Sequence, residues 1–314
     1  SCQRTLSRGN LVSFFLAYFS KIMTLLHRRG VQLIAAAVAG WCGCRTYDHI
    51  STKNRLHAAT LLPSTSILPA EPAATSSRPS QIMRFGFPGT DSVRFLDDYV
   101  LSYDRRNRTA HWVFEHLTKE SLQKNDKVDR SKCTFVEDTE VHPYFQARNS
   151  DYKGSGFDRG HLAAAGNHRK CQRDVDQTFL LSNMAPQVGK GFNRDSWNRL
   201  EKHVRHLTNK YKNVYVCTGP LYLPRVESDG KKYVKYQVIG ANHVAVPTHF
   251  FKVVVAETEN AEFDLEAYVM PNAVIDDATP LKSFLVPVET IERASGLLLF
   301  DKIGKDRLRR INGR

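Results

Sequence analysis

Acidic residues are missing from the start of the chain, where the first aspartate or glutamate is Asp48. Cysteine is also sparse: there are six in 314 residues, no CxxC pair occurs, and three of the six precede residue 45. This spacing excludes a disulfide framework of the kind that holds small secreted domains together. Long apolar runs are lacking too, because VQLIAAAVAGWCGC has only 14 residues, fewer than the roughly 20 that a membrane-spanning helix needs.

The acid-free stretch predicts a mitochondrial targeting segment over residues 1–60. Arginine and lysine alternate there with apolar runs such as LVSFFLAYF, a pattern typical of import signals. Two alternatives stay open, a secretory signal with VQLIAAAVAGWCGC as its core and a short segment that associates with the inner membrane. From 61 to 80, LLPSTSILPAEPAATSSRPS predicts a flexible linker. We therefore expect a globular domain at 81–303, followed by a basic tail at 304–314.

Basic residues outnumber acidic ones in the chain as a whole, but the excess is unevenly distributed. The formal net charge is +13 at pH 7, and the isoelectric point is about 9.5. Within the expected domain the excess is concentrated between residues 153 and 212, where 12 basic residues outnumber five acidic ones. This charge favours an anionic partner such as nucleic acid, an anionic membrane or an acidic import machinery. A solvated charged face is the plainer alternative.

The hydrophobic pattern predicts a mixed α+β fold. Runs of β-branched and aromatic residues predict strands at 111–118, 178–182, 213–219, 250–257 and 263–270. A helix is expected at 195–211, with Asp195 or Ser196 as its cap. A second helix is expected at 290–297, where Glu289 and Glu292 favour the positive N-terminus. Helices and strands do not alternate regularly, which favours α+β over a doubly wound parallel sheet.

The helix expected at 195–211 has an apolar stripe and a polar face. The stripe repeats at spacings of three and four and consists of Trp197, Leu200, Val204, Leu207 and Tyr211. Asn198, Glu201 and Arg205 share the polar face, and Asn193 lies just before the first turn. The plainer alternative is an exposed Glu201–Arg205 ion pair beside a turn asparagine.

The stretch GFDRGHLAAAGNHR at 156–169 contains the best candidate for chemistry. His161 follows Asp158 and Arg159, and an unperturbed histidine pKa of about 6.5 suits a general base at neutral pH. A competing interpretation is a zinc site formed by His161, His168 and Cys171. That interpretation lacks a fourth ligand and has an unusual spacing. We otherwise expect His168 to be structural.

Together these residues indicate phosphodiester hydrolysis. Such a reaction needs a base to activate water, a cation to neutralise the phosphate and the leaving oxygen, and positive side chains that hold the backbone. We expect His161 to be the base, and Arg159 and Arg205 to hold or neutralise phosphate. Asn193 offers a neutral oxygen to Mg²⁺, and Glu201 can hold a water of that ion, because Mg²⁺ prefers oxygen ligands and keeps several waters. Mn²⁺ is expected to substitute for Mg²⁺.

The same residues resemble the signature of the DNA/RNA non-specific endonucleases. DRGHLAAAGNHR (158–169) is followed by TFLLSNMAPQ (178–187), FNRDSWNRLE (192–201), NVYVCTGPLYLPR (213–225) and further blocks up to FLVPVETIERASGLLLF (284–300). The resemblance covers nearly all of residues 81–303. It implies an α+β fold, a ββα-metal (His-Me finger) nuclease domain with a central, mainly antiparallel sheet flanked by helices. In that family a hairpin presents the histidine and the following helix supplies the metal site.

The resemblance also implies roles for individual residues. His161 is again the general base, and Asn193 and Glu201 hold the Mg²⁺ ion directly and through a water. Arg159 and Arg205 match arginines near the phosphate. The resemblance adds Asn183, which matches an asparagine that orients the site, and Asp158, which matches the acid before the histidine. It further implies DNA and RNA as substrates with little sequence preference, and assembly as a homodimer.

Two departures from the family pattern are visible. The interval from Asn183 to Asn193 is ten residues, one more than the pattern usually has, so a residue is inserted before the expected metal ligand. Some relatives also have a phosphate-contacting arginine upstream of the motif. The best match to that arginine here is Cys133, beside Lys132.

We therefore expect a Mg²⁺-dependent, sugar-non-specific endonuclease of mitochondria, located by resemblance in the intermembrane space or at the inner membrane. Two alternatives compete with this expectation. A mitochondrial 5′–3′ exonuclease of the same superfamily would carry an added C-terminal helical segment, whereas only DKIGKDRLRRINGR follows the domain here. A catalytically weak nucleic-acid-binding protein would have lost the histidine or the metal ligand, and both are present.

Overall fold

The computed structural model describes residues 78–87 and 90–314. The expected targeting segment and most of the expected linker, up to residue 77, lie outside the described residues. The first described element, helix α2 (Arg78–Ile82), begins within the last three residues assigned to the linker. In this described part of the chain, no helix is long and apolar enough to span a membrane.

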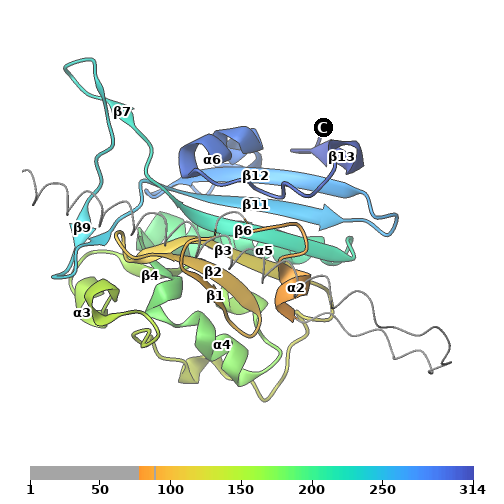
Figure 1. The fold of residues 1–314 in the computed structure, drawn as a ribbon, viewed down its shortest axis with the longest axis horizontal. Coiled ribbons are helices and arrows are strands. Elements are labelled where there is room, and N and C mark those ends of the chain that lie inside the picture. Colours follow the sequence, from red (N-terminus) through yellow and green to blue (C-terminus); the bar gives the residue numbers. More distant parts are fainter. Residues whose placement is uncertain (1–77, 88–89) are drawn as a thin grey trace, which may run out of the picture. The chain divides into compact units, whose positions relative to one another are not determined.

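A seven-stranded sheet forms the centre of the fold (Figure 1). Its strand order is β1-β2-β3-β6-β11-β12-β13, and every neighbouring pair is antiparallel except β12 with β13. The strands are β1 (Val93–Phe95), β2 (Tyr99–Asp104), β3 (Thr109–Leu117), β6 (Asn213–Leu221), β11 (His249–Glu257), β12 (Phe263–Pro271) and β13 (Leu308–Ile311). The predicted α+β class with a mainly antiparallel central sheet is confirmed.

Shorter elements surround this sheet. Besides α2, the helices are α3 (Asn149–Tyr152), α4 (Gln172–Thr178), α5 (Asn198–Leu207) and α6 (Val288–Ser295). Three further strand pairs are β4 (Asp158–His161) with β5 (Met184–Gln187), β7 (Arg225–Val226) with β8 (Lys232–Tyr233), and β9 (Val238–Ile239) with β10 (Val244–Ala245). The β7–β8 hairpin extends away from the body of the domain in Figure 1. The segment 304–314, expected to be a basic tail, contains β13, which pairs with β12 at one edge of the central sheet.

Alternation along β11 divides the core into two layers. Side chains of successive residues point to opposite faces of a strand, and the two sets belong to different apolar clusters: Phe250, Val254 and Ala256 in one, and Phe251, Val253 and Val255 in the other. The first cluster includes Leu200 of α5, and the second includes Ile291 of α6. We call the two sides of the sheet the α5 face and the α6 face.

Four of the five predicted strands are confirmed to within two residues, as β3, β6, β11 and β12. The prediction of a strand at 178–182 is wrong. Thr178 is the last residue of α4, and Leu181–Asn183 form a 3-10 turn before β5 begins at Met184. The amide of Asn183 donates to the Thr178 carbonyl at 2.8 Å, and this bond closes the turn that the apolar pattern could not reveal.

The apolar stripe of the predicted helix at 195–211 is confirmed, since Trp197, Leu200 and Val204 are all buried. The helix itself, α5, is shorter and follows an irregular π-type turn at Gly189–Trp197. The predicted caps are wrong, because the side chains of Asp195 and Ser196 both bond to the backbone of Gly191. They fix the turn before the helix and do not cap it.

The second predicted helix, at 290–297, is confirmed with a shift of two residues as α6. Gly296 follows it with a φ of 73°, the left-handed conformation that commonly ends a helix. Glu289 lies in the first turn as expected. The expected role of Glu292 at the N-terminus is wrong, because its carboxylate accepts a hydrogen bond from the Leu299 backbone beyond the C-terminus.

Candidate active site

A cleft of about 420 Å³ lies where β4, the turn before α5 and α5 itself meet. Its lining consists of Arg130, Phe135, Phe157, Asp158, Arg159, His161, Ala165, Gly166, Asn193, Arg194, Asn198 and Glu201. Strand β4 pairs with β5 so that His161 lies opposite Met184, at the end of the hairpin. The cleft therefore brings together the histidine motif, the predicted metal ligand and the polar face of the helix. A larger cavity between β12, α6 and β13 contains none of these residues.

His161 presents a neutral imidazole at this cleft. Its ring packs edge-on against Phe179 at a centroid distance of 4.7 Å and lies 5.8 Å from the ring of Phe135. Burial lowers the pKa of His161 to about 3, and the positive charges of Arg130 and His168 act in the same direction. The imidazole is therefore uncharged at neutral pH and able to accept a proton. Its Nε2 is enclosed and has no hydrogen-bond partner in the structure.

Asn193 is held with its amide oxygen available. Its Nδ2 donates to Asp158 at 3.0 Å, and Arg194 donates two further hydrogen bonds to the same carboxylate, at 2.6 and 2.8 Å. The hydrogen bonds from Arg194 keep the pKa of Asp158 below its usual value, so the carboxylate stays ionised. Since the amide nitrogen is occupied by Asp158, the amide oxygen of Asn193 is the atom that can meet a cation.

The interval between Asn183 and Asn193 ends in the π-type turn. Within this turn Lys190 is extended and Gly191 has a φ of 86°, a conformation that favours glycine. A Cβ at Gly191 would also meet Val274 at 2.7 Å. The turn is fixed by its own hydrogen bonds, and Asn193 reaches the cleft.

Glu201 and Arg205 lie one turn apart on α5. Their side chains are only 15% and 18% exposed, with 4.0 Å between Oε2 and Nη1, so the alternative of a solvated surface pair is wrong. Burial raises the pKa of Glu201, and the positive charges of Lys252 and Arg205 oppose that rise. Burial lowers the pKa of Arg205, and Glu201 opposes that change. Glu201 lines the cleft, whereas Arg205 packs just behind Gly166.

Arg159 is oriented by aromatic rings. Its guanidinium lies 4.9 Å from the centre of the Phe135 ring and 5.6 Å from that of Tyr152. One hydrogen bond, at 3.4 Å, joins it to the carbonyl of Asn149. Stacking of this kind fixes a guanidinium without neutralising it, so Arg159 keeps its positive charge at the wall of the cleft.

Arg130 also lines the cleft, and the sequence reasoning missed it. Its guanidinium lies 5.9 Å from the centre of the Phe179 ring, which packs on His161. Cys133, which was matched to the upstream arginine, points elsewhere and contacts the carboxylate of Asp176 at 3.1 Å. The available signal was the arginine in DRSKC, three residues before the cysteine. Phe135 was missed as well, because no spacing rule relates it to the histidine.

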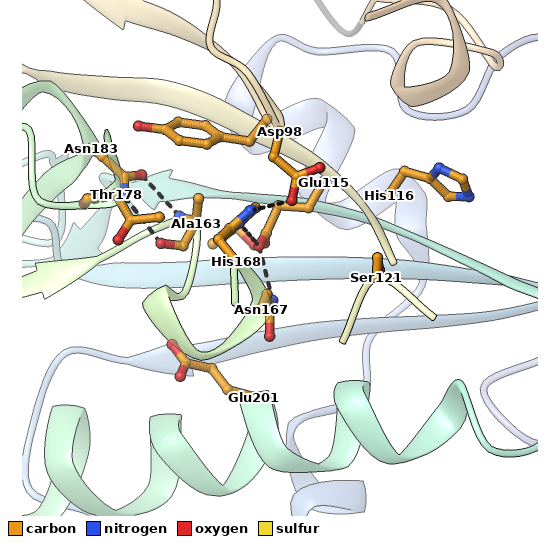
Figure 2. Close-up of polar contacts among 12 residues, drawn as sticks. Asp98, Glu115, His116, Ser121, Ala163, Asn167, His168, Thr178, Asn183 and Glu201 are labelled. Atoms are coloured by element: carbon orange, nitrogen blue, oxygen red, sulfur yellow. Dashed lines mark hydrogen bonds and ion pairs between the residues drawn. The ribbon is translucent and has the colours of Figure 1, made fainter. Parts of the chain in front are cut away.

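Asn183 and His168, which the sequence analysis names as a site residue and a structural residue, both lie behind the cleft. Asn183 is fully buried, and it exchanges hydrogen bonds of 2.9 and 3.0 Å with the backbone of Ala163 (Figure 2). It therefore fixes the chain two residues after His161 and does not line the cleft. His168 is also buried, and both its ring nitrogens contact carboxylates, Asp98 at 2.8 Å and Glu115 at 3.0 Å.

His168 has no lone pair for zinc. Both of its partners can only accept hydrogen bonds, so both ring nitrogens must carry hydrogen. Burial disfavours the charged ring, but the hydrogen bonds to Asp98 and Glu115 outweigh that effect and raise the pKa of His168 to about 9. The zinc interpretation of His161, His168 and Cys171 is therefore wrong for the arrangement seen here.

The donor atoms of the cleft fit a hard divalent cation. The amide oxygen of Asn193 and the carboxylate of Glu201 are the type of ligand that Mg²⁺ and Mn²⁺ prefer. No group of three or more His, Cys, Asp or Glu side chains that could hold a metal occurs among residues 78–87 and 90–314. A cation at Asn193 would thus keep most of its water, as Mg²⁺ commonly does and structural zinc does not.

The arrangement combines the three elements that phosphodiester hydrolysis needs. A neutral imidazole can accept a proton, oxygen ligands can hold a cation, and Arg130 and Arg159 supply fixed positive charge. His161 and Arg159 come from β4, whereas the oxygen ligands and Arg130 come from other segments, and all of them share one cleft.

Comparison with known protein families gives one match. A family model described as DNA/RNA non-specific endonuclease matches residues 78–306. That range contains every residue of the cleft.

The chain is also similar to individual proteins. It is 50% identical over 292 residues to a mitochondrial endonuclease G of Caenorhabditis elegans, covering 88% of this chain and 95% of that one. It is 57% identical over 223 residues to the human mitochondrial endonuclease G, covering 71% and 74%. A crystal structure of the EndoG/EndoGI complex, described as showing how EndoG is inhibited, contains a chain 64% identical with a TM-score of 0.76, covering 77% of this chain and 98% of that one.

Proposed function

The chain belongs to the DNA/RNA non-specific endonuclease family and hydrolyses phosphodiester bonds, and we propose that it is a Mg²⁺-dependent endonuclease that cuts both DNA and RNA in mitochondria. One observation supports this most strongly. A neutral His161 shares a single cleft with the oxygen donors of Asn193 and Glu201 and with fixed arginines.

His161 is the general base in this proposal. We assign the proton acceptor to Nδ1, because Nε2 is enclosed and has no partner. As the water oxygen bonds to phosphorus, its proton passes to Nδ1, and the bond from phosphorus to the leaving oxygen breaks. The lowered pKa of His161 keeps the ring free of a proton until this step.

Asn193 would bind the divalent cation directly, and Glu201 would hold it through a water. When bound, Mg²⁺ neutralises negative charge that develops on the phosphate and the leaving oxygen. Arg159 and Arg205 would bind or neutralise the phosphate, and Arg130 adds a third positive charge beside His161. Asp158 supports the site by holding the amide nitrogen of Asn193.

A second pocket extends the site along the surface. It measures about 310 Å³ and shares Arg130, Ala165 and Gly166 with the cleft. Lys124 and Arg169 add positive charge to its lining. Such side chains bind the phosphates of a nucleic acid whatever its base sequence. The affinity for nucleic acid should therefore fall steeply as the salt concentration increases.

The segments outside the nuclease domain would have roles in targeting and as connections. Residues 1–60 would direct the protein to mitochondria, residues 61–80 would link them to the nuclease domain at 81–303, and residues 304–314 would follow as a basic tail. The compartment would be the intermembrane space or the inner membrane, with the first segment able to associate with that membrane. The relatives' names include mitochondria, which supports the organelle. We also propose a homodimer.

Supercoiled plasmid with and without EDTA tests the function. We expect nicked circles, then linear DNA and short fragments, with Mg²⁺ or Mn²⁺ and none with EDTA. A closed circle has no end, so nicking excludes an exonuclease. Binding without cutting would instead support the catalytically weak scaffold. Single-stranded RNA of the same length should be cut under the same conditions.

The metal assignment has a separate test. Asn193→Ala and Glu201→Ala should raise the Mg²⁺ concentration needed for half-maximal rate or abolish turnover. Asn209→Ala, at an exposed position just beyond α5, is a matched control that should behave as the parent. Full activity of both site variants at nanomolar free Mg²⁺ would refute the assignment.

A further inference from the structure

Asn167 joins the cleft to a buried carboxylate, and it has no part in the mechanism above. Its side chain is 3% exposed. Its Nδ2 donates to Glu115 at 2.8 Å, and its Oδ1 accepts from Nη1 of Arg205 at 3.0 Å. Figure 2 shows this amide bonded to Glu115 from a short turn that faces α5. Because the guanidinium of Arg205 can only donate, the amide cannot turn over, and its oxygen must face Arg205.

Glu115 is itself held in place. It lies on β3 with no exposed surface, and the same Oε1 that binds Asn167 also accepts from Nε2 of His168 at 3.0 Å. The other ring nitrogen of His168 bonds to Asp98, whose carboxylate accepts from Arg78 at 2.8 Å. These hydrogen bonds hold the Asn167 amide from behind, although Oε2 of Glu115 has no hydrogen-bond partner of its own.

Arg205 lies among charges of both signs. Burial lowers its pKa, the positive charges of Arg169 and Arg130 act in the same direction, and the negative charges of Glu201 and Glu115 oppose them. Glu201 is 4.0 Å away, beyond hydrogen-bond distance. The oxygen of Asn167 is the acceptor that meets Arg205 at hydrogen-bond distance in the described residues.

Two details make Asn167 suitable for this role. An amide is neutral, so it holds the guanidinium without cancelling the charge that a phosphate would bind. Gly166 beside it leaves space, since a Cβ there would lie 3.0 Å from Nη1 of Arg205. Gly166 also lines both the cleft and the adjoining pocket, which places Arg205 directly beneath the proposed path of the substrate.

We propose that Asn167 is a positioning residue that holds Arg205 toward the scissile phosphate, and that the buried Glu115–His168 pair fixes the amide that does so. This inference rests on the proposed function, because it assigns the purpose of the contact to phosphate binding by Arg205.

A double-mutant cycle tests the proposal. Asn167→Leu keeps the number and branching of side-chain heavy atoms and removes both hydrogen bonds, and we expect kcat to fall on the order of 10- to 100-fold with little change in KM. Arg205→Ala should lower kcat on the order of 100-fold or more. Because Asn167 acts through Arg205, the double variant should be no slower than Arg205→Ala alone. Losses that multiply would overturn the proposal.

Asn213 provides the matched control. It too donates its amide to a carboxylate, Glu257 at 2.9 Å, and meets a histidine through its oxygen, His116 at 2.8 Å. Asn213→Leu should lower thermal stability by about as much as Asn167→Leu but leave kcat unchanged. An equal loss of kcat in both variants would mean a structural effect, and would also overturn the proposal.

A second cycle covers the case in which Asn167→Leu does not fold. Glu115→Gln keeps the volume and one acceptor oxygen but removes the charge that orients the amide. We expect a loss of kcat of a few fold, on the order of one lost hydrogen bond, again absent in the Arg205→Ala background. Failure of the proposed function looks different: Arg205→Ala itself would then cut at the parent rate.

Discussion

The two faces of the central sheet are built from the same strands, yet only one of them contains charge beneath its centre. On the α6 face, Trp112, Phe114 and Cys217 pack in a continuous apolar cluster. On the α5 face, β3 has Glu115 and β11 has Lys252 at inward positions where apolar residues are usual. The alternation of the two strands is unchanged, but charged side chains lie in the core at these two positions.

Lys252 shows what the difference means. The residue is 1% exposed, and its ammonium group donates to Thr218 on the neighbouring strand at 2.6 Å and lies 4.9 Å from the ring centre of Trp197. Burial lowers its pKa, and the negative charges of Glu115 and Glu201 oppose that change. Buried charges cost stability unless they are paired. The sheet thus accepts this cost at the centre of the face that supports the cleft. On the other face the buried Glu257 lies at the end of β11 and is paired with Arg84.

We expect the largest loss of activity from a substitution in the cleft, which the α5 face supports. His161→Ala should reduce plasmid cutting by roughly 100-fold or more, because general-base catalysis is lost, while folding and DNA binding persist. His111→Ala is the control, since His111 meets the Ser295 carbonyl of α6 and lies away from the cleft. Unchanged cutting by His161→Ala in the plasmid assay would refute the base assignment.

Removal of the buried cation should have the next largest effect. Lys252→Met removes one of the positive charges beside Glu115 and Glu201, so unfolding should become easier by about 3 to 5 kcal/mol. The pKa of Glu201 should rise further, which moves the acidic limb of the pH–rate profile to higher pH.

Val253→Ala, one residue along β11 and on the α6 face, is the matched control for this variant. It should be destabilised by roughly 1 to 3 kcal/mol without any shift of the pH profile. Denaturant unfolding and initial rates between pH 5 and 9 measure both variants. A shifted profile in the α6-face variant would remove the distinction between the two faces.

The stability contributed by His168 should depend on pH. Its folded pKa of about 9 exceeds the unfolded value of about 6.5, so the contribution is complete below about pH 6.5 and is lost as pH rises through about 9. The melting temperature of the parent should therefore fall across that range, and His168→Gln should flatten the dependence. Parallel curves for the parent and the variant would contradict the charged state of His168.

The smallest effect is expected on the α6 face. Cys217 is fully buried among apolar side chains there, and burial raises the pKa of its thiol, so it stays uncharged. Cys217→Ala removes one atom and should lower stability by roughly 1 kcal/mol. kcat, KM and the Mg²⁺ requirement should match those of the parent in the plasmid assay. A changed Mg²⁺ requirement would show that this face also affects the site.

Local pattern explains what could be predicted from the sequence. The stripe of Trp197, Leu200 and Val204 and the four long strands follow from periods of 3.6 and 2. The turn at Leu181–Asn183 was missed because its apolar residues resemble a strand, and only the side chain of Asn183 shows otherwise. Patterns of this kind describe one segment at a time.

The missed parts of the site depend on contacts between distant segments. Arg130 reaches His161 across the ring of Phe179, and no spacing rule connects those three positions. In the sequence, Glu115 is one charged residue within a strand. Its role becomes visible only in the structure, where Asn167 and His168 both donate to its carboxylate. His168 was correctly expected to be structural, but its partners could not be named from the sequence.

The two outermost strands of the sheet, β1 and β13, are only three and four residues long. β13, with two arginines, pairs along part of the nine-residue β12. Short, charged border strands discourage a neighbouring molecule from adding its own strand to a sheet. Pairing of two copies strand to strand is therefore disfavoured at these borders. Removing residues 308–314 should uncover the edge of β12 and increase aggregation, which light scattering would measure.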